Sequence, residues 1–343
     1  MKILIPSYEP NEKLVNLVEQ IKELTNIPII VVNDGSGENY NEIFETLKTK
    51  GVTVLKHQTN QGKGAAIKTG IKYLIKNNEK QGCVCADSDG QHTVKDILRI
   101  CEELEKDKKD IVLGVRNFKK ENIPFRSKFG NNISKILFYA MTGEKVRDTQ
   151  TGLRGYSSKI FEWLLAIDGN RYEYEFNILL KMKEEGITYT QIDIETIYED
   201  KNECSHFRVI RDSILIYKPV CKFLISSVLS AIIDFVLLMI FQMFFNNLLL
   251  AVICSRSISS IFNFVLNKNY VFDKKESKNA IRMAGKYFSL VIIIMIFNYL
   301  ILNLLNTIIG INLVISKIIT EIILYSFSFI AQKRVVFKNR KEK

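Results

Sequence analysis

The sequence predicts an α/β domain with a mostly parallel sheet, followed by a domain of four membrane-spanning helices. Two observations lead to this prediction. Over residues 1–200, short β-rich runs alternate with helical patterns, which is typical of parallel sheets. After residue 220 come four long apolar segments, each near the ~20 residues that a helix needs to cross ~30 Å of hydrocarbon.

The charge distribution supports this division. The 343 residues carry a formal charge of +11, but residues 221–343 hold 15 basic and five acidic residues, so that this part alone is +10. Its basic residues alternate with apolar runs instead of lining a soluble groove, which excludes a nucleic-acid-binding surface. Six cysteines without a CxxC pair, and only three histidines, exclude a disulfide framework and a structural zinc site and favour free thiols in a reducing compartment.

Five short runs in the first domain predict strands. They are Lys2–Pro6, Pro28–Val32, Thr53–Lys56, Cys83–Ala86 and Ile111–Leu113, with helical patterns such as Leu14–Leu24 and Ala65–Lys76 between them. Polar turns follow three of these strands, at residues 7–9, 33–36 and 87–91. Ligands bind at the carboxyl edge of such sheets, so we expect a nucleotide site there.

Two carboxylates stand one residue apart in the last of these turns. Asp87 and Asp89 follow an apolar strand, and such a pair can hold a hard cation while leaving positions for substrate phosphates. An EF-hand is excluded because Leu98 occupies its bidentate position. The run Gly62-Lys63-Gly64 matches neither a dinucleotide-binding loop nor a P-loop. The alternative for the acidic pair is an ordinary surface turn.

Three arginines lie in segments with little apolar support. Arg116, Arg126 and Arg154 are candidate ligands for an anionic acceptor, because arginine binds phosphate oxygens in a bidentate manner; the alternative is solvated loop charge. Residues 205–218 then place apolar side chains at helical spacing with Arg208 elsewhere. Such a helix can lie in the lipid headgroup layer, unless it is an ordinary amphipathic core helix.

The four apolar segments of the tail cover about residues 223–245, 248–266, 287–309 and 312–331. Basic residues gather in the 267–286 connection and after residue 331, so the positive-inside rule places both termini in the cytoplasm. The amino terminus lacks a signal-peptide core, which keeps the first domain there too. Buried helices of a soluble core are the alternative.

The tail also contains an internal repeat and a few ionisable residues. Residues 263–272 recur 65 positions later as residues 328–337, which predicts two helical hairpins with basic and aromatic anchors. We expect Asp234, Arg256 and Glu321 to form a buried cluster, since charges within a bilayer need partners. The cluster is either a polar path or lipid-phosphate site, or a device that fixes helix registry.

Five motifs together resemble the family 2 glycosyltransferases of the dolichyl-phosphate mannose synthase and polyprenyl-phosphate glucosyltransferase type. They are Ile3-Leu-Ile-Pro-Ser-Tyr-Glu9, Val31-Val-Asn-Asp-Gly-Ser36, Asn60-Gln-Gly-Lys-Gly-Ala-Ala66, Asp87-Ser-Asp-Gly-Gln-His92 and Thr151-Gly-Leu-Arg-Gly-Tyr156. The tail repeat resembles the GtrA membrane domain. The resemblance implies a GT-A-type, Rossmann-like domain at residues 1–204, an interfacial helix at 205–220 and a GtrA-like domain at 221–343.

The resemblance also implies roles for individual residues. Those expected to bind the nucleotide are Pro6, Tyr8, Glu9, Asn33, Asp34, Lys63, Asp87 and Ser88. Asn33 stands where the family usually has Asp. Those expected to bind Mg²⁺ or Mn²⁺ are Asp87, Asp89 and Gln91. The resemblance assigns Arg116, Arg126 and Ser134 to the acceptor, and Arg154 and Arg208, named above from their own sequence context, complete the expected acceptor-binding set. The expected catalytic set is Asp89, Arg116, Arg126 and Asp148.

The implied reaction is an inverting transfer of a monosaccharide from a UDP- or GDP-hexose to undecaprenyl or dolichyl phosphate at the cytoplasmic membrane face. A phosphate monoester has a second pKa near ~6, so the acceptor is already an anion and Asp148 is better suited to an orienting role than to proton transfer. Two alternatives stay open: another lipid or glycan acceptor, and a flippase-like tail that carries the lipid-linked sugar. Transmembrane hairpins also make a homo-oligomer an expected assembly.

Overall fold

The computed structural model divides the chain into two compact units, Met1–Ile216 and Tyr217–Lys343. The residues that it describes are 1–106, 108–116, 131–132, 134–135, 138–139, 142–183, 185–195, 218–245, 248–272 and 280–337. Most of the predicted interfacial helix at 205–220 therefore lies outside the described residues. The predicted domain boundaries stay predictions.

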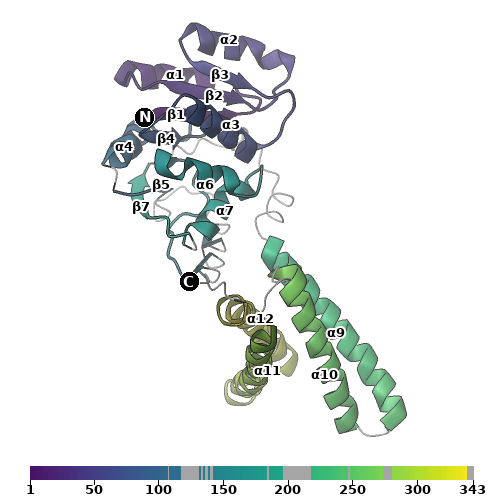
Figure 1. Cartoon of the computed structure of the whole chain (residues 1–343). Coiled ribbons are helices and arrows are strands. Elements are labelled where there is room, and N and C mark those ends of the chain that lie inside the picture. The colour runs from purple at the N-terminus through teal and green to yellow at the C-terminus, as the bar shows by residue number, and fades with distance from the viewer. Residues whose placement is uncertain are drawn as a thin grey trace. The chain divides into compact units, whose positions relative to one another are not determined.

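The first unit is built on one seven-stranded sheet with the order β3-β2-β1-β4-β6-β5-β7 (Figure 1). The strands are β1 (Lys2–Ser7), β2 (Ile29–Asn33), β3 (Thr53–Lys56), β4 (Gly82–Cys85), β5 (Ile111–Arg116), β6 (Arg154–Ser157) and β7 (Tyr189–Ile194). β6 runs antiparallel to β4 and β5, and the other pairs are parallel. The prediction of a mostly parallel α/β sheet is thus confirmed.

All five predicted strands are present, whereas β6 and β7 were not predicted. β6 carries few residues that favour strands, but Gly155 allows it to pack closely. A Cβ there would lie 3.0 Å from Ile100 Cγ2 and 3.3 Å from Val112 Cβ. Tight packing against its neighbours, which no local pattern reveals, therefore holds this strand in the middle of the sheet.

Helices cover both faces of the sheet (Figure 1). One face packs against α1 (Glu12–Leu24), α2 (Asn41–Thr49) and α4 (Val94–Glu105), and the other against α3 (Lys63–Lys76), α6 (Phe161–Ala166) and α7 (Glu173–Met182). Ile3 and Ile5 belong to the core of the first face. Leu4 points to the second face, where its side chain fills the space that a Cβ on Gly70 of α3 would need. Each fully buried side chain of this size stabilises the fold by about 1.5–3 kcal/mol.

The sheet order determines where a ligand can bind. β1, β2 and β4 are parallel, so their carboxyl ends lie at one edge. The chain builds β1, β2 and β3 outward on one side of β1 and then returns to place β4 on the other. Ligands of such sheets bind at the carboxyl edge, beside the two strands where the order reverses, here β1 and β4.

The described cysteines are free. Cys83, Cys85 and Cys101 are buried in the first unit, and Cys221 and Cys254 are half-buried in the second. Burial raises the pKa of Cys101 to about 12, so this thiol stays protonated and unreactive. The prediction of a reducing compartment stays a prediction, and Cys204 lies outside the described residues.

The second unit contains the helices α9 (Lys218–Phe245), α10 (Leu248–Leu266), α11 (Ala280–Asn303) and α12 (Leu313–Ala331), which match the four predicted segments in order (Figure 1). By length and composition, one helix among the described residues, Val220–Phe245, could cross a membrane. The prediction of four spans is therefore supported by helix positions but is not confirmed. Short π-helical turns follow α10, α11 and α12 at Asn267–Val271, Leu304–Ile308 and Gln332–Val336.

The repeated sequence adopts the same local structure twice. The turns Asn267–Val271 and Gln332–Val336 are 65 residues apart, and in each a lysine from the first helix of the same hairpin, α9 or α11, caps a backbone carbonyl. Lys222 Nζ donates to Tyr270 O at 3.0 Å, and Lys286 Nζ donates to Val335 O at 2.9 Å. The rings of Phe272 and Phe337, equivalent residues of the repeat, stack with centroids 4.8 Å apart. The two predicted hairpins thus end in the same local structure, and the two ends are in contact.

A chain of buried amides and hydroxyls, here called the seam, joins the two halves. Asn267 Nδ2 donates to Gln332 Oε1 at 2.9 Å and to Asn263 Oδ1 at 2.7 Å. Ser226 Oγ donates to Asn267 Oδ1 at 2.7 Å, and Tyr287 OH donates to Asn263 Oδ1 at 2.9 Å. Helices α9, α10 and α11 and the turn after α12 all contribute, so these bonds fix how the helices align.

The expected cluster around Arg256 is only partly described. Ser259 Oγ donates to Asp234 Oδ1 at 2.9 Å between α10 and α9. The side chains of Arg256 and Glu321 lie outside the described residues. The cluster stays a prediction.

Candidate active site

Asp87 lies at the carboxyl edge of the sheet, shortly after β4, which pairs with β1. Ala86 N donates to Leu4 O at 3.1 Å, so β4 remains bonded to β1 up to the residue before the acidic turn. Asp87 has 29% of its side chain exposed. Its carboxylate packs against Gly152, where any Cβ would overlap Asp87 Oδ2. The glycine of the loop before β6 therefore allows the carboxylate to be held at this position.

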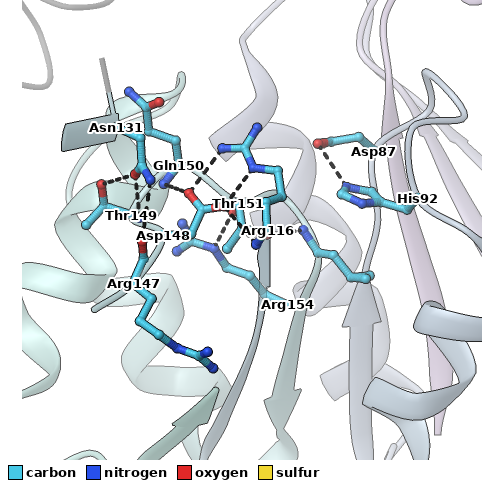
Figure 2. Close-up of polar contacts among 11 residues, drawn as sticks. Asp87, His92, Arg116, Asn131, Arg147, Asp148, Thr149, Gln150, Thr151 and Arg154 are labelled. Atoms are coloured by element: carbon cyan, nitrogen blue, oxygen red, sulfur yellow. Dashed lines mark hydrogen bonds and ion pairs between the residues drawn. The ribbon is translucent and has the colours of Figure 1, made fainter. Parts of the chain in front are cut away.

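Asp87 is paired with two basic side chains. Lys63 Nζ, at the start of α3, is 2.7 Å from Asp87 Oδ1, and His92 Nε2 is 3.5 Å from Asp87 Oδ2. Figure 2 shows His92 facing Asp87. Burial alone would raise the pKa of Asp87, but the charges of Lys63 and His92 hold that pKa well below its usual range. Asp87 is consequently an anion at any physiological pH.

Lys63 also contacts a carboxylate that the sequence did not indicate. Its Nζ lies 2.7 Å from Glu175 Oε2, which belongs to the first turn of α7. Burial favours a lower pKa for Lys63, but Asp87 and Glu175 together raise its pKa well above the usual value. Glu175 lies 112 residues from Lys63 in an acidic helix start, and no local motif marks it.

Asp89 differs from Asp87 in its electrostatics. Burial, followed by the charge of nearby Asp87, raises the pKa of Asp89. Its Oδ1 accepts a hydrogen bond from Gln91 N at 3.0 Å. Two neighbouring carboxylates whose pKa values are driven apart are typical of functional sites.

Arg116 and Asp148 form a second charged pair (Figure 2). Arg116 Nε donates to Asp148 Oδ2 at 2.6 Å and Nη2 donates to Oδ1 at 3.1 Å. Asp148 is 0% exposed and also accepts a bond from Gln150 N at 3.0 Å. A bidentate pair of this kind fixes the plane of the guanidinium, so Asp148 sets the direction in which Arg116 points at the end of β5.

The position of Arg154 contradicts the prediction that this residue binds the acceptor. Its side chain is 0% exposed in β6, where Nε donates to Thr151 O at 2.9 Å and Nη1 donates to Glu175 O at 2.7 Å. The sequence places it beside turn-forming residues, but β6 lies in the middle of the sheet. A buried guanidinium bonded to two backbone carbonyls has no surface to offer an acceptor.

The carboxylate of Asp34 is bonded to the neighbouring loops of the protein. It is buried after β2, and its carboxylate accepts bonds from Gln61 N at 2.9 Å and Gly62 N at 2.7 Å. His57 Nδ1 lies 2.7 Å from its Oδ1. This arrangement holds the loop that leads into α3, and so positions Lys63; a direct contact of Asp34 with a nucleoside stays a prediction.

The other predicted site residues are distributed as follows. Asn33 Oδ1 accepts a bond from Ser36 N at 2.8 Å, and Glu9 N donates to Ser36 Oγ at 2.8 Å, so the turns after β1 and β2 meet. Pro6 is buried in β1, while Tyr8, Ser88 and Gln91 are half-buried at the same edge. Ser134 is buried with no hydrogen-bond partner for its Oγ in the described part of the chain. Arg126 and Arg208 lie outside the described residues.

The described residues contain no group of three or more His, Cys, Asp or Glu side chains arranged to hold a metal ion. The predicted metal ligands are two carboxylates and an amide. Their role toward a cation is therefore a proposal.

Known families match both units of the chain. Residues 2–165 match the family described as Glycosyl transferase family 2, and residues 222–337 match the GtrA/DPMS transmembrane domain. An uncharacterised protein of Methanocaldococcus jannaschii is 28% identical over 224 residues, which cover 64% of this chain and 90% of that protein.

Two relatives have named activities. The UDP-N-acetylglucosamine–dolichyl-phosphate N-acetylglucosaminyltransferase of Methanococcus voltae is 28% identical over 216 residues, covering 58% of this chain and 86% of that enzyme. The dolichyl-phosphate beta-glucosyltransferase of Dictyostelium discoideum is 22% identical over 223 residues, covering 56% of this chain and 67% of that enzyme.

Proposed function

We propose that the chain, a glycosyltransferase that joins a family 2 glycosyltransferase domain to a GtrA/DPMS transmembrane domain, transfers a monosaccharide from a nucleotide-diphosphate sugar to a polyprenyl phosphate. The observation that carries the proposal is the pairing of Asp87 with Lys63 at the carboxyl edge of β4. An anion and a cation side by side at this edge suit a diphosphate with its counter-ion. The names of the two dolichyl-phosphate transferases support the choice of acceptor.

The acidic turn fits a divalent cation. Asp87 is ionised and partly exposed, and the pKa of Asp89 is raised by burial and by Asp87. Carboxylate oxygens are the ligands that Mg²⁺ and Mn²⁺ prefer, and a cation would relieve the repulsion between the two groups. Asp87 and Asp89, with Gln91, would hold it. When bound, such an ion neutralises the charge that develops on the departing nucleotide diphosphate.

The acceptor needs positioning more than activation. A phosphate monoester is already nucleophilic at neutral pH because its second pKa is near ~6. Arg116 is held by Asp148 in a fixed plane and can bind a phosphate oxygen, which aligns the attacking oxygen with the sugar carbon. Arg126 and Ser134 remain further candidates for this contact. Asp148 acts here as an orienting residue and takes no proton.

The second unit would bring this site to the membrane. Lys222 and Lys286, near the starts of α9 and α11, cap the turns that follow α10 and α12, and Lys268 and Lys333 lie in those turns, whereas Lys317 lies near the start of α12. By the positive-inside rule the helix ends at these turns face the cytoplasm. We therefore propose a multi-pass protein with both termini and the active site on the cytoplasmic face.

The donor is tested by thermal stabilisation of the full chain in detergent with UDP-, GDP- and dTDP-sugars, each with and without Mn²⁺. A ligand at 100 times its Kd should add about 2.7 kcal/mol to the free energy of unfolding. We expect one nucleotide to stabilise strongly, and only with the metal. No stabilisation by any nucleotide sugar would contradict the proposed donor.

The acceptor is tested by the lability of the product. A sugar transferred to a polyprenyl phosphate is released by mild acid, whereas an ordinary glycolipid is not. An acid-stable product would favour a different lipid or glycan acceptor.

The raised pKa of Asp89 predicts a pH dependence for Mn²⁺ binding. Below that pKa, Asp89 carries a proton where a cation would bind, so the affinity should fall by up to about tenfold per pH unit. Since burial and Asp87 shift the pKa upward, the midpoint should lie above the ~3.9 of a free aspartate. Titration of Mn²⁺ binding against pH measures it, with exposed Asp168→Asn as the control. A midpoint at or below that of free aspartate contradicts the prediction.

A further inference from the structure

A line of alternating charges runs from the centre of the sheet to the acidic turn. Arg154 Nε lies 3.8 Å from Glu175 Oε1, Glu175 Oε2 lies 2.7 Å from Lys63 Nζ, and Lys63 Nζ lies 2.7 Å from Asp87 Oδ1. The four residues come from β6, α7, α3 and the turn after β4. The arrangement brings together residues that the sequence spreads over 112 positions.

The two carboxylates that share Lys63 differ in exposure. Glu175 is 10% exposed and its backbone carbonyl accepts a bond from the fully buried Arg154, whereas Asp87 is 29% exposed on a turn. Lys63 itself is 14% exposed. An ammonium group buried to this extent is costly without a partner, so Lys63 can release Asp87 only if Glu175 retains it.

We propose that Lys63 is a built-in counter-ion for Asp87 that a divalent cation displaces, and that Glu175 is the positioning residue that holds Lys63 after the displacement. This inference rests on the proposed function, because it assumes that Asp87 binds a metal with the donor. Lys63 then remains at the start of α3, beside the site, as a second positive charge toward the leaving diphosphate. Glu175 contacts neither substrate nor cation.

The proposal predicts opposite effects of two variants on Mn²⁺ affinity. In Glu175→Gln, Lys63 has only Asp87 as a charged partner, so a cation must displace it at greater cost and the affinity falls. In Lys63→Met the competitor is absent, so the affinity rises. For a partly buried charge pair we expect each change to be about three- to tenfold.

The test is a Mn²⁺ titration of the full chain in detergent, with free Mn²⁺ followed by electron paramagnetic resonance. Four variants are compared with the unchanged protein: Glu175→Gln, Lys63→Met, their combination, and Glu162→Gln on the exposed surface of α6 as the matched control. We expect the double variant to bind like Lys63→Met, since Glu175 acts only through Lys63, and the control to bind normally. Near-normal binding by Glu175→Asp would support a positioning role.

Three outcomes would overturn the inference. Unchanged Mn²⁺ affinity in Glu175→Gln would show that Lys63 does not compete. If Glu175→Gln lowers the Mn²⁺ affinity equally in the unchanged protein and in Lys63→Met, then Glu175 acts through space on the cation and not through Lys63. If Glu175→Gln does not fold, the inference is tested by Lys63→Met alone. An unchanged or lower Mn²⁺ affinity in Lys63→Met also overturns the inference.

The same titration distinguishes a failure of the proposed function from a failure of this inference. If the unchanged protein binds no Mn²⁺, the inference and the metal part of the proposed function fall together. If it binds Mn²⁺ and stabilises with a nucleotide sugar but the variants behave like the control, only the role of Glu175 and Lys63 is wrong.

Discussion

We expect Asp89→Asn to reduce sugar transfer by at least about 10²- to 10³-fold while leaving the fold intact. The change keeps the shape of the side chain and its acceptor oxygen for Gln91 N, which Asp89 Oδ1 binds at 3.0 Å. It removes the negative charge that would hold the cation. Asparagine also relieves the repulsion with Asp87 that raises the pKa of Asp89, so stability should not fall. Transfer of labelled sugar to a short-chain polyprenyl phosphate measures the loss.

The matched control is Asp168→Asn, the same chemical change at a side chain that is 89% exposed and 3.4 Å from Lys181. Surface pairs of this kind contribute about 0–1 kcal/mol, so turnover and melting temperature should stay unchanged. Near-normal turnover in Asp89→Asn would remove the basis for the metal assignment.

Asp148→Asn should lower both stability and turnover. Asp148 is fully buried and bonded twice to Arg116, and removal of one partner from a buried pair costs about 3–5 kcal/mol. For a unit of this size that corresponds to a fall of roughly 6–20 °C in melting temperature. The loss of a fixed guanidinium should also lower kcat more than it raises KM for the donor. Thermal unfolding and steady-state kinetics of the full chain measure both.

The variant Arg116→Met distinguishes an orienting role of Asp148 from a direct contact of Asp148 with the reacting groups. If Asp148 works only by orienting Arg116, then Asp148→Asn should cost little further turnover in a chain that already carries Arg116→Met. A large additional loss would instead indicate that Asp148 contacts the reacting groups itself.

Much of the fold could be predicted because its central strands are buried on both faces. β1, β2 and β4 are continuous apolar runs ended by polar turns, a pattern that needs no knowledge of the partners. β6 could not be predicted, since Arg154 and Gly155 do not favour a strand; neighbours on both sides hold it in place. β7, with only Ile194 well buried, lies at the sheet's edge and carries a weak pattern.

The candidate site shows the same division between local and long-range information. Asp87, Asp89 and Lys63 could be named because each stands in a short motif at a strand or helix end. Glu175 could not, because its role comes from a contact with Lys63 across 112 residues. Arg154 was misassigned for a related reason: its turn-like neighbours predicted exposure, but the sheet order buries it. Residue roles at the acceptor side, including Arg126 and Arg208, stay predictions.

The seam has a consequence for how the membrane domain is made. The first hairpin contributes Asn267, but the acceptor Gln332 is synthesised 65 residues later, which at about 5–20 residues per second is a delay of several seconds. Until then only one of the two N–H groups of the Asn267 amide has its partner, because Asn263 and Ser226 belong to the first hairpin and Gln332 does not. If the four helices span the membrane as proposed, the domain is therefore complete only when α11 and α12 pack against α9 and α10, and a chain that ends before Gln332 lacks the bond that joins the two halves.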